Sequence, residues 1–147
     1  MTSALVTSGL FGRQFSEPGV AGEFSAEAFG ARMLAFEAAW TRALAAAGAV
    51  TPGDAEAALA AIARARPDPV ALGAGSDRDG VPVPALVAAL REGLGPGPAA
   101  AIHTGATSQD VVDTAMALTL LAVADRIGAL IDGLALAVAQ LRARFGD

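Results

Sequence analysis

The sequence contains no cysteine, no lysine and a single histidine, His103. Without cysteine the chain can form no disulfide bond, no thiolate metal site and no cysteine nucleophile, which agrees with the cytoplasmic localisation that we expect. Its ten positive charges are all arginines, scattered along a chain with a formal net charge of −5. Because such a chain has no basic patch to neutralise phosphates, we do not expect nucleic acid as a partner.

The sequence also lacks a long apolar run that is free of charge. Its most hydrophobic run, residues 115–124, is followed at once by Asp125 and Arg126, whereas a membrane span needs roughly 20 apolar residues. No positive residue precedes Arg13, and residues 1–10 have no long apolar core, so we expect no secretory signal. We therefore expect no membrane partner, and the hydrophobic content of 54% predicts one domain with an apolar core.

What the sequence does contain is helical periodicity. No segment alternates like a strand, so the predicted fold class is all-α. Residues 1–24 are broken by glycine and proline, and we expect them to form an extended arm that carries Phe11 and Phe15. Ser25 is expected to cap a helix that ends at Gly48. The apolar stripe of this helix consists of Phe29, Met33, Phe36, Trp40 and Leu44.

Shorter segments follow this first long helix. A second helix is expected to begin at Thr51 and Pro52 and to stop before Pro67. Residues 66–80 are rich in proline, glycine and aspartate, and they predict a loop. That loop leads into a short helix through residues 86–90, which the glycines after it terminate.

The last helix is expected to be close to 40 residues long, because no proline or strong breaker appears between Asp110 and Gly146. Apolar residues lie on several of its faces, so it needs neighbours on several sides. The rest of the chain is too small to cover them, which predicts burial in an oligomeric bundle or against further chain. We assign residues 1–100 to an N-terminal helical domain, and residues 101–147 to a loop and the start of a long central bundle helix.

The loop before the long helix, residues 103–110, has the composition of an anion site. Backbone N–H groups at a helix N-terminus lack acceptors and carry a partial positive charge, so anions bind there readily. Gly105 allows a close turn, while Thr107 and Ser108 add hydroxyl donors. His103 can add a further donor without any metal. Spacing alone leaves two other readings open, a plain helix cap at Thr107 or Ser108 and a packed histidine.

The run His103-x-Gly105-Ala106-Thr107-Ser108-Gln109-Asp110, followed by Asp113 and Thr114, resembles the first signature region of the fumarase/aspartase superfamily. This version is shared by adenylosuccinate lyases and 3-carboxy-cis,cis-muconate cycloisomerases, and its Gln-Asp ending favours the cycloisomerases. Residues 32–39 and 48–50 resemble the first helix of that family and its exit. Residues 78–84 resemble its second substrate loop, where adenylosuccinate lyases have a histidine.

The resemblance implies a homotetramer around a central bundle of long helices, which acts on a small tricarboxylate substrate without a cofactor or a metal. Thr107 and Ser108 would bind a substrate carboxylate, with His103 nearby as a donor. Arg78 could equally be a solvated loop charge. The residues that the resemblance assigns to substrate binding are His103, Thr107, Ser108, Arg78 and Asp79, and those that orient the loop are Gln109 and Asp110.

The implied reaction interconverts 3-carboxy-cis,cis-muconate and 4-carboxymuconolactone in protocatechuate breakdown. A base removes the proton alpha to a carboxylate, which then carries two negative charges, and a carboxylate oxygen leaves from the neighbouring carbon. Stabilising that charge is the main task of the site. The Thr-His-x-Gln-Pro motif and the Gly-Ser-Ser loop that transfer protons in the family are absent. We therefore expect no catalytic residue here and an N-terminal fragment that is inactive alone.

Two other functions stay open at this point. An adenylosuccinate lyase or a related lyase of the same superfamily shares the first signature. A non-catalytic helical assembly domain would also explain the apolar long helix and the missing catalytic segments.

Overall fold

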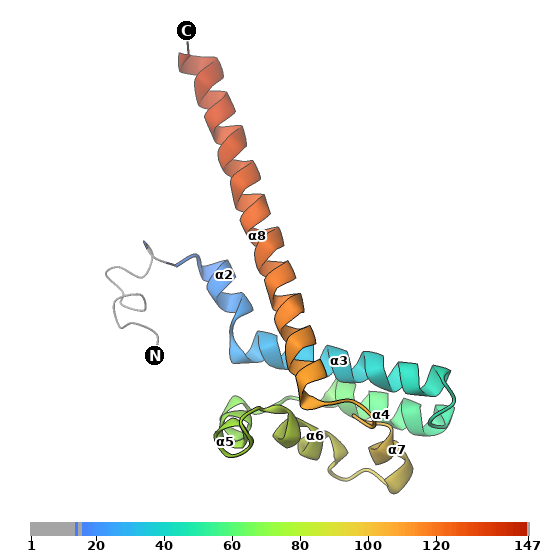
Figure 1. Cartoon of the computed structure of the whole chain (residues 1–147). Helices are drawn as coiled ribbons and strands as arrows, with labels where there is room; N and C mark the ends of the chain where they lie inside the picture. Colours follow the sequence, from blue (N-terminus) through green and yellow to red (C-terminus); the bar gives the residue numbers. More distant parts are fainter. Residues whose placement is uncertain (1–13, 15, 147) are drawn as a thin grey trace. The chain divides into compact units, whose positions relative to one another are not determined.

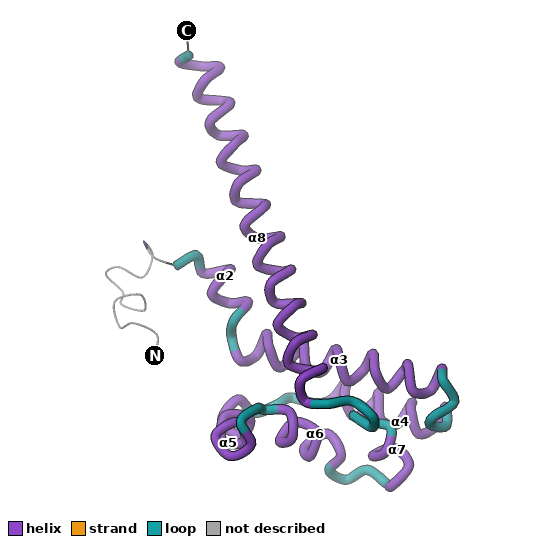
Figure 2. The backbone as a smooth tube through the Cα atoms, viewed as in Figure 1, coloured by secondary structure: helices purple, strands orange, loops and turns teal. Residues whose placement is uncertain are grey.

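The computed structural model describes residue 14 and residues 16–146, so the arm residues Phe11 and Phe15 lie outside the described residues. Within this part of the chain the regular elements are helices and none is a strand, which confirms the all-α prediction (Figures 1 and 2). Contacts divide the described residues into residues 26–118 and a second unit made of those before residue 26 and those from 119 to 146. This division lies inside the last helix, and the domain boundary expected after residue 100 stays a prediction.

The unit of residues 26–118 is built from helices that pack in pairs. Helix α3 packs against α4, α4 against α7, and α5 against α6. The helices are α3 (Ala26–Ala46), α4 (Pro52–Arg64), α5 (Pro69–Asp79), α6 (Val83–Arg91), α7 (Pro96–Ala100) and the first turns of α8 (Ser108–Phe145). The buried core between them consists of Met33, Ala58, Ile62, Val83, Leu86, Val87, Leu90, Ala101, Ile102, Val111 and Ala115.

The ends of α3 and α4 lie where the sequence predicts them. Helix α3 stops at Ala46, and Gly48 has a positive φ of 71°, which glycine adopts without steric cost. Helix α4 begins after Thr51, whose hydroxyl accepts a hydrogen bond from the backbone N–H of Asp54 at 3.1 Å. It ends at Arg64, before Pro67. Local capping chemistry therefore fixes both helices.

The loop expected over residues 66–80 is wrong, because residues 69–79 of this segment form helix α5. The carboxylate of Asp68 caps the helix by accepting a hydrogen bond from the N–H of Val70 at 3.0 Å. Pro69 occupies the first turn, where its missing N–H costs nothing, and Gly80 ends the helix with a φ of 79°. The proline and glycine that were interpreted as breakers mark the two ends of a helix.

The extended arm is also wrong over its last part, where residues 18–23 form the short helix α2 (Pro18–Glu23). The Glu17 carboxylate caps this helix by accepting a hydrogen bond from the N–H of Val20 at 2.6 Å. Glu17 also pairs with Arg126 at 2.7 Å, within the second unit. A capped first turn and an ion pair thus order a segment whose composition predicts irregular chain.

Helix α8 has 38 residues, which confirms the prediction of one long final helix. Its later turns expose large apolar side chains, among them Leu121 at 62%, Leu134 at 64% and Leu136 at 62%. By length and composition alone the helix could cross a membrane, because an 18-residue window has a mean hydropathy of 1.6 and is 11% buried. Helices that pack against other helices in soluble proteins pass the same test, so this is weak support for a membrane.

Candidate functional site

The loop between α7 and α8 makes a tight turn at the predicted signature. His103 has a positive φ of 60°, which few residues other than glycine adopt, and Gly105 has a φ of 78°. The N–H of Ala106 closes the turn by donating to the carbonyl oxygen of His103 at 3.3 Å. A non-glycine residue in this region persists only where its surroundings hold it there.

Side chains of two helices hold the backbone of this loop. From α3, the Thr41 hydroxyl donates to the carbonyl oxygen of Ala101 at 3.0 Å, and Trp40 Nε1 donates to that of Thr104 at 2.9 Å. From α6, the Arg91 guanidinium donates to the carbonyl oxygen of Ile102 at 2.7 Å. Three carbonyl groups that helices or strands would otherwise satisfy are therefore bound by side chains.

The His103 side chain is held by a buried carboxylate on α3. Its Nδ1 lies 2.6 Å from Oε1 of Glu37, whose side chain is 0% exposed, while the imidazole is 15% exposed. Burial raises the pKa of Glu37 above its usual range, and the hydrogen bond with His103 opposes that rise. Among the described residues, Glu37 Oε2 is the one buried side-chain oxygen or nitrogen without a hydrogen-bond partner.

Thr107 and Asp110 form a reciprocal cap at the start of α8. Asp110 Oδ2 accepts hydrogen bonds from the Thr107 backbone N–H and from its hydroxyl, both at 2.8 Å. The Asp110 N–H donates back to the Thr107 hydroxyl at 3.3 Å. The backbone hydrogen bond, followed by that of the hydroxyl, lowers the pKa of Asp110 below its usual range. The Thr107 hydroxyl hydrogen is thus already used within the cap.

Ser108 and Gln109 stand in the first turn of α8. The partly buried Ser108 hydroxyl has no hydrogen-bond partner in the part of the chain that the structure describes. Gln109 Nε2 donates to Asp113 Oδ1 at 2.5 Å, one turn along the helix. Because Thr107 and Asp110 use their own N–H groups in the cap, those of Ser108 and Gln109 are the ones left at this helix end.

Arg78 and Asp79 lie in the last turn of α5 rather than in a loop. They pair with each other in a two-pronged contact, Nε to Oδ1 at 3.0 Å and NH2 to Oδ2 at 2.7 Å. This pairing raises the pKa of Arg78 and lowers that of Asp79. Among the described residues no hydrogen bond or ion pair joins them to the loop at His103. The structure therefore unites His103, Thr107, Ser108, Gln109 and Asp110 but leaves these two residues apart.

The sequence did not predict which side chains hold the loop. The buried residues of α3 are Gly30, Met33, Glu37 and Thr41, whereas the predicted apolar stripe shares only Met33 with them. The face toward the interior thus carries two polar residues one turn apart. Glu37 belongs to the segment that resembles the first helix of the family, and that was the available signal.

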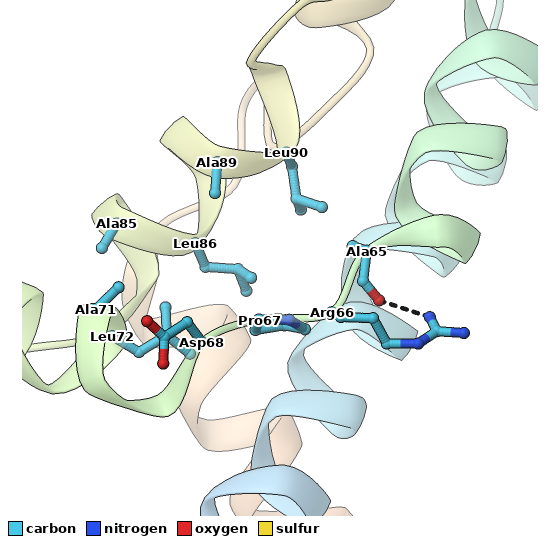
Figure 3. A pocket seen from close by; sticks show the side chains of 10 residues that line it. All are labelled: Ala65, Arg66, Pro67, Asp68, Ala71, Leu72, Ala85, Leu86, Ala89 and Leu90. Carbon is cyan, nitrogen blue, oxygen red and sulfur yellow. Dashed lines mark hydrogen bonds between the residues drawn. The ribbon is translucent and has the colours of Figure 1, made fainter.

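A pocket of about 210 Å³ lies elsewhere in this unit, between α5, α6 and the chain that leaves α4 (Figure 3). Its walls are mostly alanine and leucine side chains, such as Leu72, Leu86 and Leu90. The Arg66 guanidinium at its edge donates to the carbonyl oxygen of Ala65 at 2.7 Å. None of the predicted site residues lines this pocket, so it is separate from the loop.

A fumarate lyase from Mesorhizobium sp. BNC1 is a solved structure similar to this chain, with a TM-score of 0.82 and 29% sequence identity. The similarity covers 88% of the chain. The fold is that of a fumarate lyase segment. The chain spans 30% of the length of that neighbour. No protein-family model and no curated protein matches the sequence.

Proposed function

We propose that this chain is a substrate-binding segment of a fumarate lyase-like enzyme, and that the enzyme is a 3-carboxy-cis,cis-muconate cycloisomerase. The observation that carries the proposal is the signature loop, held in an unusual turn by buried side chains within a fold that is similar to a fumarate lyase. The Gln109-Asp110 ending of the loop supports the cycloisomerase, as does the absence of histidine from residues 78–84.

In this proposal the loop stabilises the negative charge that gathers on a substrate carboxylate. The Ser108 hydroxyl and the N–H groups of Ser108 and Gln109 are the available donors at the start of α8. Thr107 contributes once its hydroxyl turns from Asp110 toward the ligand. Asp110 limits the site as well as ordering it, since its carboxylate lies where an anion would bind.

The remainder of the proposal concerns the whole enzyme. It is a cytoplasmic homotetramer that takes a small tricarboxylate, requires no cofactor, and supplies its proton-transferring groups from segments other than these residues. The exposed apolar turns of α8 support this assembly, because an apolar helix face is stable when other helices cover it. The same faces support the second candidate, a helical assembly domain without catalysis.

The proposal is tested by replacing both loop hydroxyls, Thr107→Ala with Ser108→Ala, in the natural protein that carries this segment. We expect kcat/KM for lactone formation to fall about 100-fold or more, on the order of 3 kcal/mol, as for other lost oxyanion donors. Ser76→Ala is the matched control, because among the described residues this hydroxyl on α5 bonds only to the Leu72 carbonyl oxygen, at 3.1 Å.

Single variants separate binding from capping. Ser108→Ala removes a hydroxyl that is not part of the cap, so its effect should fall on activity and leave stability unchanged. Thr107→Ala should also cost about 1 kcal/mol of stability, because it removes the cap. Unchanged kinetics in the double variant would refute the assigned role. Turnover of adenylosuccinate instead of the muconate would assign the enzyme to the lyases, and no turnover of either would favour the assembly domain.

A further inference from the structure

The His103 imidazole is held from one side and open on the other. Its Nδ1 contacts Glu37 in the interior at 2.6 Å. Its Nε2 has no hydrogen-bond partner in the part of the chain that the structure describes, yet it is not among the enclosed polar atoms without a partner. Nε2 is therefore accessible from outside, and it is the ring nitrogen that a ligand can reach.

The number of dissociable protons that Glu37 and His103 hold together decides whether Nε2 is a hydrogen-bond donor or an acceptor. When Glu37 and His103 together hold two dissociable protons, one of them lies between the carboxyl group and Nδ1. It is bonded either to the carboxyl group, which then donates to Nδ1, or to Nδ1, which then donates to the ionised carboxylate. In both arrangements Nε2 carries a hydrogen, and the pair is neutral as a whole. With one shared proton the pair has a net negative charge, Nδ1 keeps the hydrogen, and Nε2 has only its lone pair.

The surroundings favour the state with two protons. Glu37 is fully buried, and a net negative charge at a buried pair costs free energy that a neutral pair avoids. The charged groups that act on the pair are Arg91 from α6 and Asp110 from α8. Arg91 favours the ionised carboxylate, but it contributes least to the pKa of Glu37, whereas burial contributes most.

We propose that Glu37 is a positioning residue for His103, which fixes the ring and keeps a hydrogen on Nε2 as a donor to the ligand. That the ligand is a substrate carboxylate rests on the proposed function, but the positioning does not. Glu37 touches no ligand itself. It acts through His103, and its buried oxygen leaves the imidazole one orientation in which Nδ1 is satisfied.

The test uses nuclear magnetic resonance of the 147-residue chain with ¹⁵N-labelled histidine. His103 is the one histidine in the sequence, so the ring gives a single pair of nitrogen signals. In the unmodified chain we expect a hydrogen-bonded Nδ1 proton that exchanges slowly with water. In Glu37→Gln, we expect this proton to exchange faster, because a neutral amide replaces the carboxyl group that holds it at Nδ1.

Thr41→Val is the matched control, since it removes a buried hydrogen bond from α3 to the same loop but does not touch the ring. In this control the Nδ1 proton of His103 should exchange as slowly as in the unmodified chain. Equally slow exchange in Glu37→Gln would overturn the proposal, and so would a rapidly exchanging Nδ1 proton in the unmodified chain. Proton exchange in the unmodified chain is measured without any variant, so the proposal stays testable even where Glu37→Gln folds poorly.

An assay of the enzyme separates this inference from the proposed function. In Glu37→Gln we expect KM for the muconate to rise more than kcat falls. A KM that does not depend on Glu37 would overturn its role in binding. If the Nδ1 proton exchanges as expected but the unmodified enzyme does not turn over the muconate, the positioning stands and the proposed function fails.

Discussion

The packed unit of residues 26–118 and the later turns of α8 are both rich in apolar side chains, but the packed unit buries them and the later turns of α8 expose them. In the packed unit Leu86 is 1% exposed and Ile102 is 0% exposed. In the later turns of α8, Ile131 is 60% exposed and Leu134 is 64% exposed. The first set is covered by other side chains of the packed unit, whereas the described residues leave the second set exposed. Apolar composition therefore measures the need for burial, while the partner that provides it has to be found separately.

The largest effect is expected from a change that prevents a partner from covering the exposed apolar face of α8. Ile131→Asp with Leu134→Asp places two charges on the exposed apolar face of α8. If other copies cover this face, burying both charges is prohibitive, and the assembly should fall apart completely in sedimentation or sizing experiments. Gln140→Asp adds one charge to the same helix without replacing an apolar residue, so it should leave the assembly intact.

The variant Ile131→Asp with Leu134→Asp also distinguishes whether a helix bundle or a membrane covers this face of α8. A chain that floats with lipid vesicles, and loses this property in Ile131→Asp with Leu134→Asp, would contradict the proposed assembly. A particle of unchanged mass in the variant would contradict it too, because the apolar face would then serve no association.

A smaller effect is expected for the packed unit. Leu86→Ala should lower the free energy of unfolding by about 3 kcal/mol, because it leaves a cavity among side chains that cannot all move to fill it. At concentrations too low for association, Leu134→Ala should change it by no more than about 0.5 kcal/mol. Denaturant unfolding measures both. Equal losses would show that the exposed leucine is covered within the chain, and the contrast between the two regions would be lost.

The helices that could be predicted from the sequence are those whose signals are local. Thr51 and Pro52 start α4 through a hydrogen bond that spans three residues, and the absence of breakers gives α8 its length. Helix α5 has the same kind of signals in Asp68, Pro69 and Gly80. Composition alone predicts a loop there, because proline and glycine also break helices, and only their positions at the two ends indicate a helix.

The geometry of the site depends on contacts that no local pattern contains. Trp40, Thr41 and Glu37 reach the loop across 64, 60 and 66 residues of sequence, respectively. A glutamate on a helix is ordinarily exposed, so Glu37 becomes a buried partner only once the histidine loop lies above it. The sequence therefore predicted the loop residues themselves, but not the helix face that holds them.

The smallest effect is expected for the ion pair of Glu17 and Arg126. This pair lies near the surface, in contrast to the buried side chains of the packed unit. Their side chains are 30% and 49% exposed. The hydrogen bond with Arg126, followed by that with the N–H of Val20, lowers the pKa of Glu17 from 4.5 to about 2. Since the pKa is lower in the folded chain, the pair stabilises α2 above pH 4.5, and this contribution is lost as the pH falls toward 2.

Titration of the Glu17 carboxyl by nuclear magnetic resonance measures this directly. Arg126→Gln should raise the pKa of Glu17 part of the way back toward 4.5, because the hydrogen bond from Val20 remains. In the same chain Glu37 should have a raised pKa, because the main influence on it is burial and not a neighbouring cation. Two glutamates of one chain would then titrate on opposite sides of the usual range. If Glu17 titrated at its ordinary pKa, neither the ion pair with Arg126 nor the hydrogen bond from the Val20 N–H would stabilise α2.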